Sequence, residues 1–290
     1  MRVTQAGLWQ LVRQNLAANA TRTRQVEEQA ITGLAVNRPS DAPALLSQID
    51  RLHAATMDQD VYEQNGGQSL ARLNQMDSEL GHVHDALSRA RELVVQSSGD
   101  LMSAEQRTYV ALEVEALRAT VLQSANSNLA GRYLFSGNAW DTEPFDAAGT
   151  YMGSTDEPRT RVGANTWVTS SLDGSSVFQG GADVLAVLDG LATALNADNT
   201  AAIEASLADI DTSLGQVMFS RAEVGASANV ADDATALAAS LRSELGTRMD
   251  EMVQADPAAT YMKLSELRNA YSSALQVAAS GKGESLFDLI

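Results

Sequence analysis

Few residues of this chain have the types and spacing that catalysis or metal binding needs. The most suggestive pattern is His82-Val83-His84, in which two imidazoles lie close together in the sequence. On a helix, residues two apart point about 200° apart, so these side chains cannot share one metal ion. No HExxH pattern and no cluster of carboxylates with histidines supports a metal site elsewhere. The sequence therefore predicts surface histidines and no metal.

Other chemical signals are equally weak. The chain contains no cysteine, which excludes disulfides, cysteine-ligated zinc and thiol nucleophiles together. Gly281-Lys282-Gly283 lacks the strand–loop–helix context of a phosphate-binding loop. No pairing of a nucleophile with a base is visible. The prediction is a protein with no catalytic residues and no cofactor, not an enzyme.

Charge narrows the classes of partner. There are 37 acidic and 20 basic residues, and the formal net charge is -17. Nucleic acid and anionic membrane surfaces both attract clustered Lys and Arg, so neither is an expected partner. The first residues lack the apolar core of a secretory signal, and no membrane-spanning window is apparent. Composition alone indicates a cytoplasmic protein.

Apolar spacing predicts a mainly α protein built from long antiparallel helices, a rod-like coiled-coil bundle with a small β insertion. Residues 3–33 form one helix with a narrow stripe, and Gly33 ends it. A second helix should run over about 44–96, with a kink or break at Gly66-Gly67 because glycine is unfavourable inside helices. Ser103 and Gln106 form a capping box that starts a third helix, which completes a helical hairpin.

The run Gly131-Arg132-Tyr133-Leu134-Phe135-Ser136-Gly137 predicts a corner at which helix gives way to strand. We expect Tyr133, Leu134 and Phe135 to pack beneath the segment that follows. Residues 138–182 are rich in glycine and turn residues, and three short runs within them resemble strands: Arg161-Val162, Thr166-Trp167-Val168 and Ser176-Val177-Phe178.

Helical spacing returns at Asp183 and continues to the end of the chain. A short helix carries Val184, Leu185 and Leu188. A longer one starts near Ile203, and its seam should continue through Leu237 and Leu241 to Asp256-Pro257. A last helix over about 258–279 precedes an apolar end, 285–290.

The terminal segments have stripes too narrow to be stable alone in water, so they require partners. We expect them to pair with each other and with the same segments of neighbouring subunits. The alternative is an intramolecular coiled coil with frayed ends. The predicted subunit-interface residues are Trp9, Val12, Leu16, Val26, Leu264, Leu267, Tyr271, Leu275, Leu286, Phe287 and Leu289.

The expected domain division follows from these elements. Residues 1–43 with 256–290 form a terminal coiled-coil domain, 44–137 with 183–255 a helical rod domain, and 138–182 an inserted β-rich outer domain. Only a head-to-tail contact between such subunits builds a ring or tube.

Two motifs resemble the bacterial flagellin family. The loop Asn37-Arg38-Pro39-Ser40-Asp41-Ala42-Pro43 is similar to its amino-terminal signature, although Ala42 stands where an acidic residue is usual. The block from Arg89 to Ser97, followed by Glu105-Gln106-Arg107, resembles the next conserved block of that family. The helical resemblance covers about 1–140 and 200–290.

Within that family, the Gly131–Gly137 corner and the Leu-Phe-Asp-Leu-Ile end resemble the flagellin-like subunits that join hook to filament. The family signature is carried by Asn37, Arg38, Pro39, Ser40, Asp41 and Pro43, and the corner by Gly131, Tyr133, Phe135 and Gly137. The resemblance implies a secreted structural subunit at the hook–filament junction, exported without a cleaved signal by the flagellar type III pathway. This replaces the cytoplasmic location that composition indicated.

The implied partners are further copies of the chain, neighbouring hook-associated proteins and flagellin subunits, an export chaperone and the export apparatus. Nucleic acid and membrane insertion are not expected. Three alternatives stay open: a flagellin that forms the filament itself, a secreted coiled-coil adhesin or tip protein, and an enzyme hidden in the β insertion.

Overall fold

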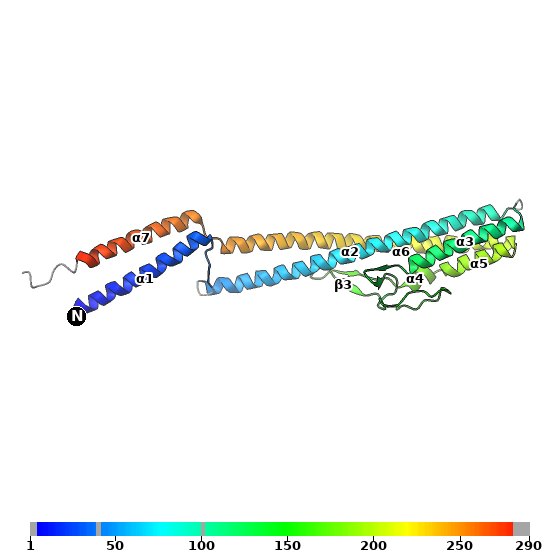
Figure 1. The fold of residues 1–290 in the computed structure, drawn as a ribbon. Coiled ribbons are helices and arrows are strands. Elements are labelled where there is room, and N and C mark those ends of the chain that lie inside the picture. Colours follow the sequence, from blue (N-terminus) through cyan, green and yellow to red (C-terminus); the bar gives the residue numbers. More distant parts are fainter. Residues whose placement is uncertain (1–4, 39–41, 100–101, 281–290) are drawn as a thin grey trace, which may run out of the picture. The chain divides into compact units, whose positions relative to one another are not determined.

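The computed structural model describes residues 5–38, 42–99 and 102–280 (Figure 1). In chain order, the elements are α1 (Gln5–Thr32), α2 (Pro43–Ser97), α3 (Ala104–Ala125), β1 (Asn128–Leu129), β2 (Arg132–Tyr133), β3 (Arg159–Arg161), β4 (Trp167–Thr169), α4 (Gly174–Gln179), α5 (Val184–Asn196), α6 (Thr200–Val253) and α7 (Pro257–Ser280). The predicted fold class, mainly helical with small two-stranded sheets inserted, is confirmed.

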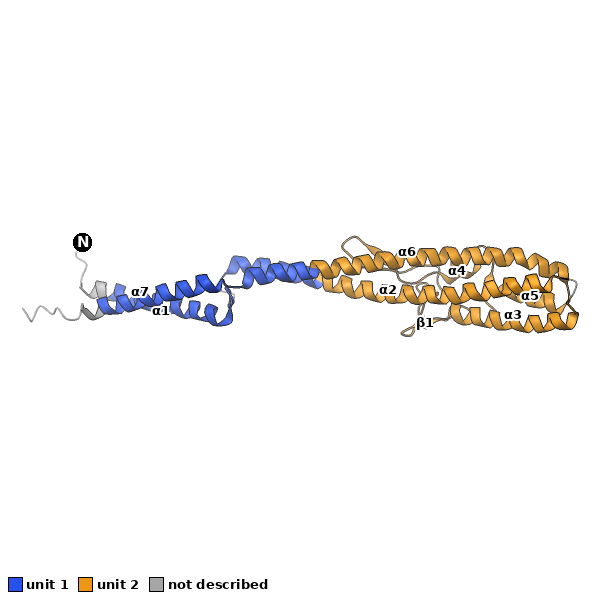
Figure 2. Ribbon diagram, turned by 90° about the horizontal axis from the view of Figure 1, so that it is seen from above, with its two compact units in different colours: residues 1–57, 242–290 blue, residues 58–241 orange. Residues whose placement is uncertain are grey.

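The chain divides into two compact units, which Figure 2 colours separately. Unit 1 consists of residues 1–57 with 242–290, and unit 2 of residues 58–241. In unit 2, α2 and α6 run antiparallel, because Asp77 pairs with Arg221 while Arg91, further along α2, pairs with the earlier Asp211. Helices α3 and α5 are likewise antiparallel, because Arg118 of α3 pairs with Asp189 of α5 at 2.6 Å while the earlier Arg107 pairs with Asp198, just beyond the end of α5.

Local sequence signals explain where α3 and α5 begin. At α3, Ser103 accepts from the Gln106 amide at 3.2 Å, and the Gln106 side chain accepts from the Ser103 amide at 2.9 Å. This confirms the predicted capping box and the helical hairpin that it starts. The predicted Asp183 caps the start of α5 at Val184, because its carboxylate accepts the Ala186 amide.

The core of unit 2 is a continuous apolar cluster drawn from α2, α3, α5, α6 and the segment between the helices. Its fully buried side chains include Leu73, Met76, Leu80, Leu87, Leu93, Leu134, Phe135, Phe145, Phe178, Leu185, Leu188 and Leu191. The segment 174–196 is apolar enough by length and hydropathy to be a candidate membrane span. It is divided between α4 and α5, however, and its large side chains lie within this core, which accounts for its hydropathy.

The expected kink at Gly66-Gly67 is wrong, since α2 is helical without interruption from Pro43 to Ser97. Gly66 is buried against α6: a Cβ at this position would come within 2.2 Å of Thr235 Oγ1. At Gly67, no atom lies within 4 Å of the place that a Cβ would occupy. The first glycine therefore permits two helices to approach closely, and packing between them outweighs its low helix propensity.

Two other expectations are wrong. Ser176-Val177-Phe178 is not a strand but lies in α4, where Asp173 caps the helix by accepting the Ser175 amide at 2.8 Å. The α6 seam does not pass through Leu237 and Leu241, which are 60% and 37% exposed. The buried positions are instead Val224, Ala231 and Ala238, spaced by sevens, because small residues let α6 lie close to its neighbours.

Candidate functional site

The terminal helices α1 and α7 pack together in unit 1. Arg268 of α7 pairs with Glu27 of α1 at 2.7 Å, and Leu264 and Leu267 are each only 8% exposed. Of the predicted interface residues on α1, Val12, Leu16 and Val26 are half-buried. The structure thus brings these predicted stripes together within one subunit. The Trp9 side chain and residues Leu286, Phe287 and Leu289 lie outside the described residues.

Main-chain hydrogen bonds fix the turn at the end of α1. Gly33 ends the helix as predicted, with φ +72°, and its amide donates to Gln29 O at 2.9 Å. Leu34 then pairs antiparallel with Gln254, flanked by bonds from Ala35 N–H to Val253 O and from Ala255 N–H to Gly33 O. The connection between α1 and α2 and the short connection between α6 and α7 are therefore joined by an isolated β-bridge.

The predicted signature loop begins at this turn. Asn37 donates to Leu34 O at 3.2 Å, and Arg38 pairs with Glu28 of α1 at 3.1 Å. Pro43 is the first residue of α2, a position at which proline needs no amide hydrogen bond. Pro39, Ser40 and Asp41 lie outside the described residues. The described part of the loop is thus held against the end of α1.

Large apolar side chains remain exposed on unit 1 despite this pairing. Tyr271 and Leu275, the outer members of the predicted α7 stripe, are 36% and 45% exposed. Five further exposed apolar residues were not singled out from the sequence: Leu11, Ile31, Tyr261, Met262 and Val277. We call these five residues, together with Tyr271 and Leu275, the terminal apolar surface. These exposed side chains lie along both terminal helices, α1 and α7.

A second exposed apolar row runs along α6 in unit 2. It consists of Met218, Phe219, Val230, Leu237 and Leu241. Beside its carboxyl-terminal part, the loop between β3 and β4 and α6 enclose a groove of about 490 Å³. Along the sequence of α6, these exposed residues stand between the buried ones. Heptad spacing alone therefore does not show which set faces the core.

The Gly131–Gly137 corner is built by backbone geometry that only glycine tolerates well. Gly131 closes the β1–β2 hairpin with φ +79°. A Cβ on Gly137 would lie 2.0 Å from Ser154 O, so no side chain fits there. Leu134 and Phe135 are buried as predicted, while Tyr133 is half-buried.

An aromatic cluster anchors the insertion to this corner. Phe178 makes edge-on contacts with Phe135 at 5.3 Å and with Phe145 at 5.4 Å. The Tyr151 hydroxyl donates to Phe135 O or Ser154 O, at 3.2 and 2.9 Å. Burial, and after it the charge of Asp173, raise the pKa of the Tyr151 hydroxyl. The corner is thus joined to the insertion by ring packing and by the Tyr151 hydroxyl.

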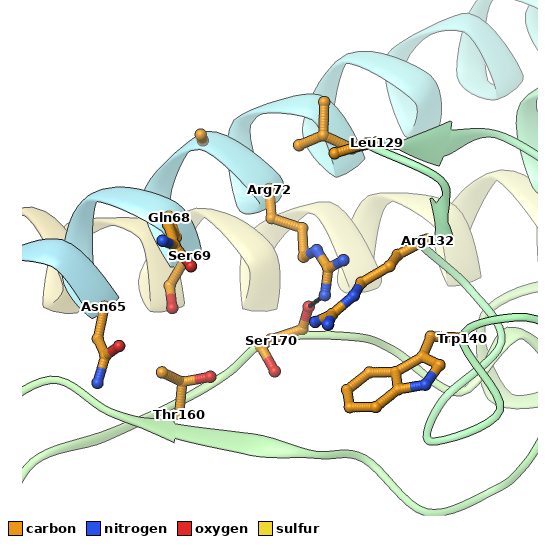
Figure 3. Close-up of a pocket in the computed structure, with 11 residues that line it drawn as sticks. Asn65, Gln68, Ser69, Arg72, Leu129, Arg132, Trp140, Thr160 and Ser170 are labelled. Atoms are coloured by element: carbon orange, nitrogen blue, oxygen red, sulfur yellow. Dashed lines mark hydrogen bonds between the residues drawn. The ribbon is translucent and has the colours of Figure 1, made fainter.

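Next to this corner is a polar cleft of about 480 Å³ between α2, the β1–β2 hairpin and the β3–β4 ribbon (Figure 3). Arg72 of α2 and Arg132 of β2 both extend into it, with their guanidinium groups toward one another. The Arg132 guanidinium lies 4.3 Å from the centre of the Trp140 ring, and Arg72 donates to Ser170 O at 3.4 Å. Sequence reasoning missed this cleft, because Arg132 was noted only as part of the corner motif.

Comparison with known proteins gives a consistent result. The bacterial flagellin N-terminal helical region matches residues 6–139. Flagellar hook-associated protein 3 of Escherichia coli is 27% identical over 288 residues, which cover 90% of this chain and 91% of that protein.

Two solved structures share the fold. A Vibrio parahaemolyticus protein assigned as flagellar hook-associated has a TM-score of 0.68 at 20% identity, covering 74% of this chain and 100% of that one. FlgL of Xanthomonas campestris has a TM-score of 0.62 at 22% identity, covering 70% and 99%.

Proposed function

We propose that the chain belongs to the bacterial flagellin family, in the group of hook-associated protein 3, and that it assembles head to tail through its terminal helices. Its role is structural and not enzymatic, and its place is the hook–filament junction of the flagellum. One observation carries this assignment: the match to hook-associated protein 3 spans nine tenths of both chains and so includes the corner.

The terminal apolar surface supports assembly through α1 and α7. Hydrophobic groups left exposed after the two helices have paired gain most by burial against further helices. In the flagellum these would belong to neighbouring copies of this chain, to other hook-associated proteins and to flagellin. A heterologous contact of this kind closes into a ring or tube.

The finer roles of the segments follow from the same reasoning. We propose that residues 1–43 with 256–290 form the inner coiled-coil domain around the axial channel, and that 44–137 with 183–255 form the rod. Residues 138–182 would form the outer domain, fixed to the rod by the aromatic cluster. The absence of cysteine is compatible with export of an unfolded chain, because no disulfide has to be opened. An export chaperone that covers the terminal helices before export completes the proposed set of partners.

Deleting the gene for this protein in its own bacterium tests the junction role. We expect cells that retain hooks but lack filaments, with unassembled flagellin released into the medium, because flagellin has no subunit on which to start. A filament subunit would give a different result, namely bare hooks without released flagellin. In a second arm, the purified protein is salted out. Long filaments formed by this protein alone would contradict the proposal.

A further inference from the structure

The cleft in Figure 3 has an unusual charge environment for so acidic a chain. Of the nine arginines of unit 2, Arg72, Arg132, Arg159 and Arg161 have no carboxylate partner among the described ion pairs. The other five each pair with a carboxylate: Arg89, Arg91, Arg107, Arg118 and Arg221. Within the described residues, neither Arg72 nor Arg132 has such a partner. With 37 acidic residues available against 20 basic ones, two adjacent arginines left without an acidic partner need an explanation.

The two guanidinium groups also act on each other. Burial lowers the pKa of Arg72, and the positive charge of Arg132 lowers it further, because two cations near each other in one cleft repel. Arg72 makes one long hydrogen bond to Ser170 O, and Arg132 is positioned by the Trp140 ring. Most of their N–H groups thus remain available to a ligand.

The surrounding residues favour a small polar group. Gln68, Ser69 and Thr160 line the cleft with amide and hydroxyl groups, and Asn65 closes one end by donating to Arg161 O at 2.9 Å. The described lining residues include no Asp or Glu that would repel an anion.

We propose that this cleft is a carboxylate-binding site, in which Arg72 and Arg132 hold the two oxygens of one carboxylate between them. Arginine presents parallel N–H groups that match a carboxylate, and an anion between two cations removes their mutual repulsion. The carboxylate comes from one of two sources, a free small acid or an acidic side chain of a second copy of this chain.

The first arm of the test uses the purified wild-type protein and acetate. The Nε–H resonances of Arg72 and Arg132 are followed by NMR while acetate replaces chloride at constant ionic strength. The site predicts saturable shifts of both signals, and Arg132→Gln should weaken binding about ten- to hundredfold, the usual cost of losing a charged hydrogen-bond partner. Arg159→Gln is the matched control, because it removes the same charge from the neighbouring β3 outside the cleft lining. It should change binding by less than about twofold.

The second arm distinguishes the sources and rests on the proposed function. Arg132→Glu and the control Arg159→Glu are each expressed in place of the wild type, and incorporation into flagella is measured. Loss of incorporation in Arg132→Glu alone assigns the carboxylate to a neighbouring copy. Normal incorporation together with saturable acetate binding assigns it to a free acid.

The proposal is overturned if acetate produces only linear shifts, equal in wild type and Arg132→Gln, while Arg132→Glu incorporates normally. A protein that is absent from flagella would refute the junction role instead. The acetate titration of the isolated protein would still decide whether the cleft binds a carboxylate.

Discussion

Replacing Gly66 and Gly67 separately by alanine tests whether close packing between α2 and α6 overrides helix propensity. Both residues lie inside the same continuous helix, so each alanine should gain about 1 kcal/mol from propensity. At Gly67 nothing lies within 4 Å of the new Cβ, so the full gain should appear. The Gly67→Ala variant therefore serves as the matched control.

At Gly66 the new methyl group meets Thr235, with Oγ1 at 2.2 Å and Cβ at 3.3 Å. The hydroxyl is held in place because it donates to Ala231 O at 2.7 Å. Overpacking of this kind costs about 1–3 kcal/mol, so Gly66→Ala should be neutral or up to about 2 kcal/mol less stable than wild type. The propensity gain is common to both variants and cancels in their difference. That difference, about 1–3 kcal/mol, therefore measures the packing cost alone.

Thermal unfolding followed by circular dichroism is the assay. A change of 1 kcal/mol moves the midpoint of a domain of 150–250 residues by about 2–4 °C, so the two variants should be clearly separated. Thr235→Ala removes the clashing hydroxyl, and in that background Gly66→Ala should recover most of its propensity gain. Equal increases in midpoint for Gly66→Ala and Gly67→Ala would refute the argument.

Three further predictions follow. Tyr151→Phe should lower the free energy of unfolding by about 1–3 kcal/mol in urea titrations, because the hydroxyl bonded to Phe135 O or Ser154 O is lost; unchanged stability would refute this. The raised pKa of Tyr151 means that the folded state holds this proton more tightly than the unfolded state. Its contribution is therefore complete below about pH 10 and is lost as the pH rises further, so the decline in stability above pH 10 should be smaller in Tyr151→Phe. Amides of residues 10–30 should exchange rapidly in the isolated monomer, since Val12, Leu16 and Val26 are only half-buried, and full protection would contradict folding on assembly. Removing 285–290 should leave the melting of unit 2 unchanged but prevent incorporation into flagella, and normal filaments grown on this truncated chain would rule out the proposed role of the end.

Residues that act through local geometry were predictable from the sequence. Ser103 and Gln106 specify a capping box by type and spacing, Gly33 ends α1, and Asp183 precedes α5. In each case the deciding hydrogen bonds join residues within four positions of each other. Leu134 and Phe135 were also correctly expected to be buried, because an apolar run between two glycines has few other ways to be accommodated.

Features that depend on a distant partner were not predictable in the same way. Gly66 resembles a helix breaker until Thr235 of α6 is seen beside it. Ser176-Val177-Phe178 has strand-like composition, but the Asp173 cap and the contacts of Phe178 with Phe135 and Phe145 favour a helix. Leu237 and Leu241 match a seam by spacing, yet the smaller Ala231 and Ala238 face the core.

The candidate sites show the same division. The sequence identified the α7 stripe at Leu264, Leu267, Tyr271 and Leu275, but not which of these side chains stay exposed after α1 and α7 have paired. It gave no sign of the Arg72–Arg132 cleft either, because these residues are sixty positions apart and only the folded chain brings them together.

Labelled antibody on intact cells tests the junction role most directly. An antibody against this protein, viewed by electron microscopy, should mark one spot where the filament meets the hook. A second antibody against the filament protein of the same cells should label the full length beyond that spot. Label from the first antibody along the whole filament would contradict the junction role and indicate a filament subunit instead.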